Sequence, residues 1–253
     1  MQEKWRLLKQ INTNGSTQMA IDEAIMNSIR NNLSPATLRF YTWEPKCVTL
    51  GHMQDIKKEV DFDYCKNNNI TIVQRITGGG CVLHHKELTY SFIVKQEDIS
   101  KDIIKRFRIV CNCIINSFKQ LGINAEFKPI NDIIVDGKKI SGNAQTTIDG
   151  VTLIHGTILL DVDISLMQNV LKNPKFKQKG NIENAITSFR GELNRNIKNL
   201  DIKKLINSII KEFKESTGRE LVEGCLSKQE KEDVEKLKVT RYKSLMIDNL
   251  IKK

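Results

Sequence analysis

The chain has 253 residues, of which 40% are hydrophobic, 28% are charged and six are cysteine, and its formal net charge is +10. This length and apolar content suffice for one sizeable globular domain and exclude a chain that is disordered throughout. No apolar run approaches the roughly 18 residues of a membrane-spanning helix, and the first residues contain no signal-peptide core, so we expect a cytoplasmic protein without a membrane partner.

The cysteines and the positive charge exclude some classes of function. The six cysteines form no Cys-x-x-Cys pair and no disulfide-like framework, which indicates reduced thiols and no zinc site. The excess of basic residues suits an acidic partner, such as a phosphorylated cofactor, a nucleic acid or an acidic protein surface. Because the lysines are scattered and no basic helix carries interleaved aromatic residues, we expect no nucleic-acid partner.

Hydrophobic periodicity predicts alternating strands and helices in the first part of the chain. Apolar residues recur every four positions over 17–30, as on the buried face of a helix, and alternate over 88–94, as on one face of a strand. We expect this strand to pair with the one at 70–73, which leads into three consecutive glycines. The expected elements are strands at 2–10, 38–43, 47–50, 70–73 and 88–94 and helices at 17–30 and 57–68.

Sequence patterns in the second part of the chain predict a helix, a β-meander and further helices. The apolar series over 102–121 fits a core helix, and two Asp-Gly pairs, at 136–137 and 149–150, predict a three-stranded antiparallel meander over 126–162. Helices are expected at 164–171, at 201–217 and, after a capping box formed by Ser227 and Glu230, through residue 237. Residues 172–199 read as a connection rich in lysine and asparagine.

The first hairpin of the meander brings polar side chains to one sheet face. Counting outward from its tip, Ile134 lies opposite Lys139 and Asp132 opposite Ser141, and opposed residues share a face. A bulge, which we expect at 141–142, would shift this register. A polar row of this kind is also typical of a solvent-exposed sheet face without function, so both interpretations stay open.

The second hairpin adds a histidine close to the same row. Its tip places His155 opposite Ala144 and Gly156 opposite Asn143, which brings the imidazole near the polar face. A histidine of this kind is more often structural than catalytic.

Three consecutive glycines, at 78–80, lie between two apolar runs. Ordering them costs conformational entropy, so we expect that close approach of the backbone to another group, or unusual dihedral angles, offsets this cost. Backbone N–H groups in such a turn can hold an anion, and Arg75 can add a guanidinium to the same oxygens. A glycine-rich hairpin or bulge without a ligand is the alternative, and the glycines alone do not decide between the two.

Several motifs together resemble the lipoate-protein ligases, and their order and separation match as well. The resemblance covers roughly residues 5 to 200 and is closest to the short ligases that lack a fused accessory domain. The matching stretches are 38–41, 51–54, Arg75–His84, Asn131–Asp132, Lys139–Ala144 and Leu153–Thr157.

The resemblance implies a fold and a reaction. The fold is α+β, a mostly antiparallel sheet flanked by helices as in the catalytic domain of biotin and lipoate-protein ligases. It forms one domain over 1–253, with 201–253 as a helical C-terminal segment packed on it. The reaction uses ATP and Mg²⁺ to convert lipoate to lipoyl-AMP. The lipoyl group then passes to a lysine of an acceptor, either a glycine-cleavage H protein or an E2 lipoyl domain.

The resemblance also implies roles for individual residues. Lys139 is the expected catalytic residue, contacting the lipoate carboxylate, the α-phosphate and later the acyl carbonyl, where charge develops. Asp132 is expected to orient Lys139 or to bind Mg²⁺. The expected substrate- and nucleotide-binding residues are Arg75, Gly78, Gly79, Gly80, Cys81, Val82, Leu83, His84, Asn131, Asp132, Lys139, Ser141, Gly142, Ala144, His155, Gly156 and Thr157.

Three features depart from the family pattern. Gln74 stands where many relatives carry an arginine, and His85 where aspartate usually follows the histidine. The accessory domain that assists adenylation in longer members is missing. The resemblance therefore implies either a separate small accessory subunit or the use of preformed lipoyl-AMP.

The alternative is a related octanoyl or lipoyl transferase that works through a cysteine thioester, a group that residues 87–91 also resemble. Against it, residues 124–130 contain no cysteine where those enzymes carry their nucleophile, and Gly80 stands where they tend to have arginine. Cys81 is the thiol nearest the expected site, and we interpret it as a small residue of the pocket wall. A family member that only binds lipoate or adenylate is a further possibility, and a nucleic-acid-binding module ranks far behind.

Overall fold

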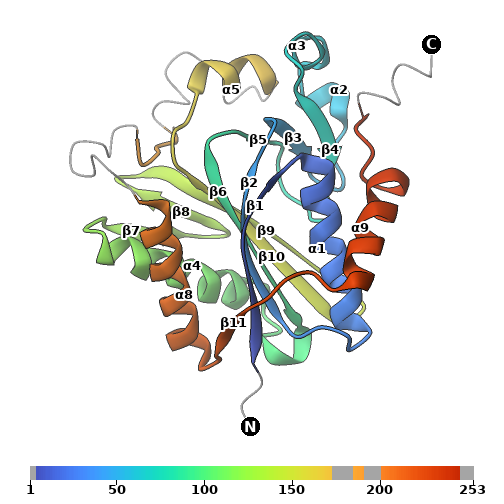
Figure 1. The fold of residues 1–253 in the computed structure, drawn as a ribbon. Helices are drawn as coiled ribbons and strands as arrows, with labels where there is room; N and C mark the ends of the chain where they lie inside the picture. The colour runs from blue at the N-terminus through green and yellow to red at the C-terminus, as the bar shows by residue number, and fades with distance from the viewer. Residues whose placement is uncertain (1–3, 173–184, 191–200, 246–253) are drawn as a thin grey trace.

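The architecture is that of two β-sheets flanked by helices, seen in a computed structural model that describes residues 4–172, 185–190 and 201–245 (Figure 1). The large sheet has the strand order β11-β1-β2-β6-β10-β9-β8-β7. Its strands are β1 (Trp5–Thr13), β2 (Thr37–Trp43), β6 (Glu87–Lys95), β7 (Ala125–Lys128), β8 (Asp132–Val135), β9 (Lys138–Ile148), β10 (Val151–Leu159) and β11 (Leu221–Glu223). The small sheet, in the order β4-β3-β5, contains β3 (Cys47–Leu50), β4 (Thr71–Gln74) and β5 (Val82–His84).

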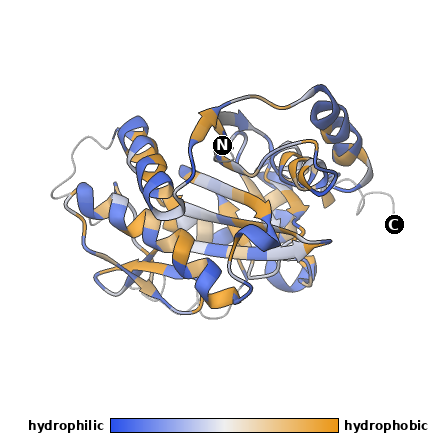
Figure 2. Cartoon of the chain, turned by 90° about the horizontal axis from the view of Figure 1, so that it is seen from below, coloured by the Kyte–Doolittle hydropathy of each residue, from blue (hydrophilic) through white to orange (hydrophobic). Residues whose placement is uncertain are grey.

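Helices cover both faces of the large sheet, because its central strands are apolar on both sides. The described helices are α1 (Gly15–Arg30), α2 (Ile56–Glu59), α3 (Phe62–Asn67), α4 (Ile103–Gln120), α5 (Ile164–Val170), α8 (Ile202–Thr217) and α9 (Lys228–Thr240), with a 3₁₀ turn at Gln96–Asp98. One core joins the sheet to α4 and α8, and a second joins it to α1 and α9. Figure 2 shows the apolar stripes of the helices turned toward the sheet. The mixed α+β fold with helix-flanked sheets is therefore as the resemblance implied.

Most of the predicted elements are present, and the pairing of the 88–94 strand is the main error. This strand, β6, lies between β2 and β10 in the large sheet, whereas the 70–73 strand, β4, pairs parallel with β3 in the small sheet. All but the last residue of β6 are buried, so it needs a partner on each side. The expected helix at 57–68 is divided into α2 and α3, and the meander gains a fourth strand, β7.

The C-terminal part of the chain is fastened to the N-terminal strand. β11 pairs parallel with β1, and the guanidinium of Arg6 donates to both carboxylate oxygens of Glu230 at 2.7 and 2.6 Å. Glu230 also closes the predicted capping box with Ser227 at the start of α9. The expected connection over 172–199 and the end of the chain lie partly outside the described residues. Among the described helices, none is long and apolar enough to cross a membrane.

Candidate functional site

A cavity of about 660 Å³ lies between the small sheet and the β8–β10 part of the large sheet. It has the size of an ordinary small-molecule site. Of the residues expected to bind substrate, Gly78 and Ser141 do not line it. Those that do are Arg75, Gly79, Gly80, Cys81, Val82, Leu83, His84, Asn131, Asp132, Lys139, Gly142, Ala144, His155, Gly156 and Thr157.

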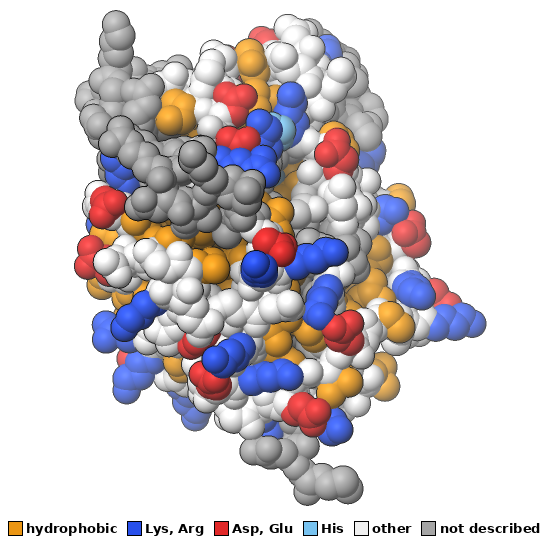
Figure 3. Space-filling model, turned by 60° about the vertical axis from the view of Figure 1, so that its left-hand side comes forward, with side chains coloured by type: hydrophobic (Ala, Val, Ile, Leu, Met, Phe, Trp, Pro, Cys, Tyr) orange, Lys and Arg blue, Asp and Glu red, His pale blue; other side chains and the backbone are white. Residues whose placement is uncertain are grey.

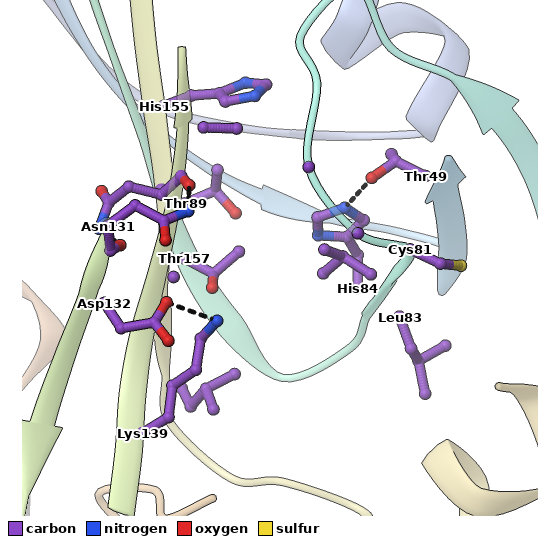
Figure 4. Close-up of a pocket in the computed structure, with 18 of the residues that line it drawn as sticks. Thr49, Cys81, Leu83, His84, Thr89, Asn131, Asp132, Lys139, His155 and Thr157 are labelled. Carbon is purple, nitrogen blue, oxygen red and sulfur yellow. Dashed lines mark hydrogen bonds and ion pairs between the residues drawn. The ribbon is translucent and has the colours of Figure 1, made fainter. Parts of the chain in front are cut away.

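The side chains of Lys139 and Asp132 meet at one edge of this cavity. The ammonium nitrogen lies 2.7 Å from Oδ1 of the carboxylate, and the two side chains are 40% and 27% exposed. Figure 4 shows both directed into the space that separates them from Thr49 and His84. A charged donor is therefore held beside the cavity and stays accessible from outside.

A bulge in β9 produces this pairing. Ile134 lies opposite Lys139, as predicted, but Asp132 lies opposite Gly142 and not opposite Ser141, because the register shifts by one residue between these pairs. The bulge comes before the position expected for it. As a result Ser141 is fully buried and is absent from the cavity wall, so its expected place beside Lys139 was wrong. The pairs His155–Ala144 and Gly156–Asn143 are as predicted.

Gly142 leaves the room that Lys139 occupies. A Cβ atom at this position would lie 2.6 Å from both Cε and Nζ of the lysine, which is closer than real Cβ contacts. The absence of a side chain at 142 therefore lets the ammonium lie across the strand toward Asp132.

Arg75 holds the glycine turn in shape. Its Nε donates to the Thr77 hydroxyl at 3.0 Å, Nη1 donates to Thr49, and Nη2 donates to the carbonyl oxygens of Gly78 and Gly80 at 2.8 and 2.7 Å. Burial lowers the pKa of Arg75 to about 10, which leaves it charged at neutral pH. A ligand contact of the kind we expected for this guanidinium would have to replace one of these bonds.

Contacts and backbone geometry require glycine at two positions, Gly79 in the turn and Gly51 in the loop beside it. Gly79 has a φ of 93°, which side chains rarely adopt, and a Cβ atom at Gly51 would overlap the carbonyl oxygen of Gly79. Gly78 and Gly80 have open space where a Cβ atom would be. Two of the three glycines are thus not required by contacts within the protein.

Two histidines in the cavity wall have matching surroundings. Nε2 of His84 lies 2.8 Å from the Thr49 hydroxyl, and its Nδ1 lies 2.6 Å from a carboxylate oxygen of Glu87. The other histidine, His155, contacts the Thr77 hydroxyl through Nε2 at 2.8 Å and faces Asp22 through Nδ1 at 3.6 Å.

The proton positions follow from the carboxylates of Glu87 and Asp22, which face Nδ1 of the two histidines and accept hydrogen bonds. We therefore assign the imidazole hydrogen to Nδ1 of His84 and of His155, so that each Nε2 accepts a hydrogen bond from the neighbouring threonine hydroxyl. Burial lowers the pKa of His155, which favours its neutral form. Since both ring nitrogens of each histidine are engaged, these side chains act as rigid wall, with Trp43 stacked on His84 at 3.8 Å between ring centroids.

The carboxylates behind the histidines were missed from the sequence. Asp22 is fully buried on α1. Burial raises its pKa, but the ion pair with Arg39 at 2.5 Å and hydrogen bonds from His155 and Ser91 outweigh burial and lower it overall. A charged residue within the apolar stripe of 17–30, and a glutamate three positions after His84, were the available signals.

Cys81 belongs to the apolar side of the cavity. Its side chain packs against the cluster formed by the small sheet with α3 and α5, and in Figure 4 its sulfur points away from Lys139 and Asp132. Burial raises the pKa of this thiol to about 12, although Arg75 opposes the shift. The thiolate, which is the reactive form of cysteine, is therefore disfavoured at neutral pH.

Gln74 and His85, the two residues that depart from the family pattern, have different surroundings. Nε2 of Gln74 donates to the carbonyl oxygen of His52 at 2.9 Å, which braces the loop 51–54 beside the glycine turn. His85 is not among the residues that line the cavity. Burial, together with Lys86 and Lys46, lowers its pKa.

The fold and the cavity define a catalytic domain of the lipoyl protein ligase class, with an apolar pocket and the ammonium group of Lys139 at its edge. The chain belongs to the lipoyl protein ligase A/B catalytic domain family, whose model matches residues 14–214.

It is 34% identical to octanoyltransferase LipM of Clostridioides difficile, over 95% of this chain and 97% of that protein, and 30% identical to octanoyltransferase LipM of Brevibacillus brevis, over 95% and 96%. A bipartite lipoate protein ligase of Thermoplasma acidophilum, which belongs to a lipoylation system with its E2 lipoyl domain, has a similar structure. Its TM-score is 0.82 with 28% identity, over 95% of this chain and 93% of that one.

These relatives correct the activity expected from the sequence. The expectation of an ATP-dependent lipoate ligase that forms lipoyl-AMP was wrong, because relatives that match over nearly the whole chain are octanoyltransferases. The accessory subunit for adenylation was part of that expectation and stays a prediction. Among the described residues, no group of three or more His, Cys, Asp or Glu side chains could hold a metal ion, and Asp132 pairs with Lys139.

Proposed function

We propose that this protein is an acyltransferase that moves an octanoyl group, or a lipoyl group, from a thioester-linked acyl carrier to a lysine of a lipoyl acceptor protein. The sequence similarity to two octanoyltransferases over nearly their whole length supports the reaction class. The acceptor class is supported by the structural neighbour, a lipoate protein ligase of a lipoylation system that includes an E2 lipoyl domain.

The single observation on which the chemistry rests is the ammonium group of Lys139 beside an apolar cavity. In acyl transfer from a thioester, negative charge develops on the carbonyl oxygen as the tetrahedral intermediate forms. An ammonium group fixed at the cavity edge by Asp132, 2.7 Å away, can donate to that oxygen. The apolar wall, which includes Trp43, Leu83 and Met167, suits a medium-length acyl chain.

On the face drawn in Figure 3, the distribution of charge gives no reason to prefer a nucleic acid. Figure 3 shows basic side chains interspersed with acidic ones over the face it draws, and they do not form one continuous stripe.

The test is transfer without ATP. The purified chain is incubated with an octanoylated acyl carrier protein and an apo H protein or apo E2 lipoyl domain, and the acceptor is weighed by intact mass spectrometry. We expect the acceptor to gain one octanoyl group, and Lys139→Ala to lower the rate about 100-fold or more. No gain with either acceptor would refute the proposed function.

A further inference from the structure

All six cysteines lie in described residues, and five of them do not line the cavity. Cys47, Cys65, Cys111 and Cys113 are buried, and Cys225 is exposed. Among the buried four, the sulfur of Cys111 accepts a hydrogen bond from the Asn143 side chain at 3.4 Å but belongs to the core between the large sheet and α4. Only one thiol, that of Cys81, is therefore in a position to meet a bound acyl group.

Cys81 is badly placed to be a nucleophile. A thiol attacks a thioester as the thiolate, and it must lie close to the donor that stabilises the oxyanion. The Cys81 sulfur points away from Lys139 and Asp132 across the cavity and packs on an apolar cluster. Neither histidine of the cavity wall is available as its base, because both ring nitrogens of His84 and of His155 face other partners.

The Lys139–Asp132 pair, in contrast, has what a direct transfer needs. The ammonium can bind the carbonyl oxygen of the donor, and the carboxylate beside it can accept a proton from an attacking amine. Both side chains are partly exposed at the cavity edge, so a lysine of a docked acceptor can reach the same point from outside.

Resting on the proposed function, we propose that the acceptor's lysine attacks the acyl thioester directly and that no acyl-enzyme forms. The neutral amine of that lysine forms the new C–N bond at the thioester carbonyl, and the oxyanion is held by Lys139. When the intermediate collapses, the C–S bond breaks. The amine proton passes by way of Asp132 to the departing sulfur, so that the products are an amide and a free carrier thiol.

This order of events requires both substrates on the enzyme at once. Initial rates measured with octanoyl-pantetheine and an apo H protein, each varied at several fixed levels of the other, should then give intersecting double-reciprocal lines. Parallel lines, the pattern of a ping-pong reaction through a covalent intermediate, would overturn the inference.

Direct detection tests the same point without kinetics. The wild-type chain incubated with octanoyl-pantetheine alone, then quenched in acid, should show no mass increase of one octanoyl group. A hydroxylamine-sensitive adduct that maps to a cysteine would overturn the inference, because it identifies the acyl-enzyme.

Substitution of the one cavity thiol gives a third measurement. We expect Cys81→Ser to keep kcat within about tenfold, with a raised KM for the octanoyl donor, whereas loss of a true nucleophile costs on the order of a thousandfold or more in kcat. Cys225→Ser, at an exposed position outside the cavity, is the matched control and should leave both constants unchanged. If Cys81→Ser does not fold, the two wild-type measurements still decide.

The experiments distinguish a failure of direct attack from a failure of the proposed function. If the wild-type chain transfers no octanoyl group to either acceptor, the proposed function is refuted and direct attack with it. If transfer occurs through a trapped thioester, the function stands and direct attack is refuted.

Discussion

Replacement of Gly142 by alanine should lower activity while leaving the fold intact. The added methyl group would meet Cε and Nζ of Lys139 at 2.6 Å, whereas ordinary contacts begin at 3.4 Å, so the ammonium must withdraw by at least the difference, about 0.8 Å. A misplacement near 1 Å in a reacting group can lower kcat by on the order of 100-fold, which corresponds to about 2.7 kcal/mol in the barrier.

The stability of the Gly142→Ala variant should barely change. The atoms that the methyl group meets are the far end of a flexible side chain, which can turn outward to water. Alanine also loses less chain entropy than glycine on folding, which offsets part of any strain by about 0.5 to 1 kcal/mol. Urea unfolding should therefore give a free energy within about 1 kcal/mol of wild type.

A double-mutant cycle identifies the cause of the lost activity. Octanoyl transfer to an apo H protein is measured for Gly142→Ala, Lys139→Ala and the double variant. If Gly142 acts only by making room for the lysine, adding its substitution to Lys139→Ala should cost nothing further. Additive losses, or a Gly142→Ala variant with wild-type kcat, would refute the reasoning.

Three further predictions concern stability. Glu230→Ala leaves the Arg6 guanidinium buried without its carboxylate partner, so we expect the free energy of unfolding in urea to fall by about 3 to 5 kcal/mol. Glu232→Ala on the same helix, where the ion pair with Lys228 is exposed, should cost less than about 1 kcal/mol, and equal losses would contradict the buried pair's role. Gly51→Ala places a methyl group against the backbone of Gly79, which cannot move easily, so we expect a lower thermal midpoint and a free energy of unfolding reduced by about 1 to 3 kcal/mol. Gly80→Ala, where the added methyl group meets open space, should be tolerated. The pKa of His155 is lower in the folded chain than in the unfolded chain, so the unfolded chain binds the proton more readily. The contribution of His155 to the free energy of unfolding should therefore be fully present above about pH 6.5 and should decline as the pH falls below that value. His155→Gln should flatten this decline, and His85, whose pKa is also lowered, should retain a smaller part of it.

Local signals in the sequence were enough for most elements. The two Asp-Gly pairs fixed the tips of the meander, and both aspartates adopt the positive φ that such turns need. The apolar series over 102–121 identified α4, whose inner face belongs to the core. These elements were predictable because their patterns depend on neighbours within a few residues.

The pairing of distant strands was less accessible. Nothing within 70–94 indicates that β4 and β6 enter different sheets, since that choice depends on β3 and β10, which lie far away in the chain. The bulge near Ile140 was expected one step too late, and this single residue decided whether Ser141 or Gly142 faces Asp132. The glycine turn was identified, but the role of Arg75 in supporting it depends on contacts with Thr49 and Thr77 that only the fold reveals.

The position of β1 has a practical consequence for anyone who shortens the chain. The family match begins at residue 14 and ends at 214, yet β1, between β2 and β11 in the large sheet, lies wholly outside that interval. A fragment cut at those limits would lose β1, β11 and α9 together and would present the bare edge of β2 to solvent. Uncovered edges of this kind recruit strands from other molecules, so such a fragment should aggregate on expression rather than yield a smaller active enzyme.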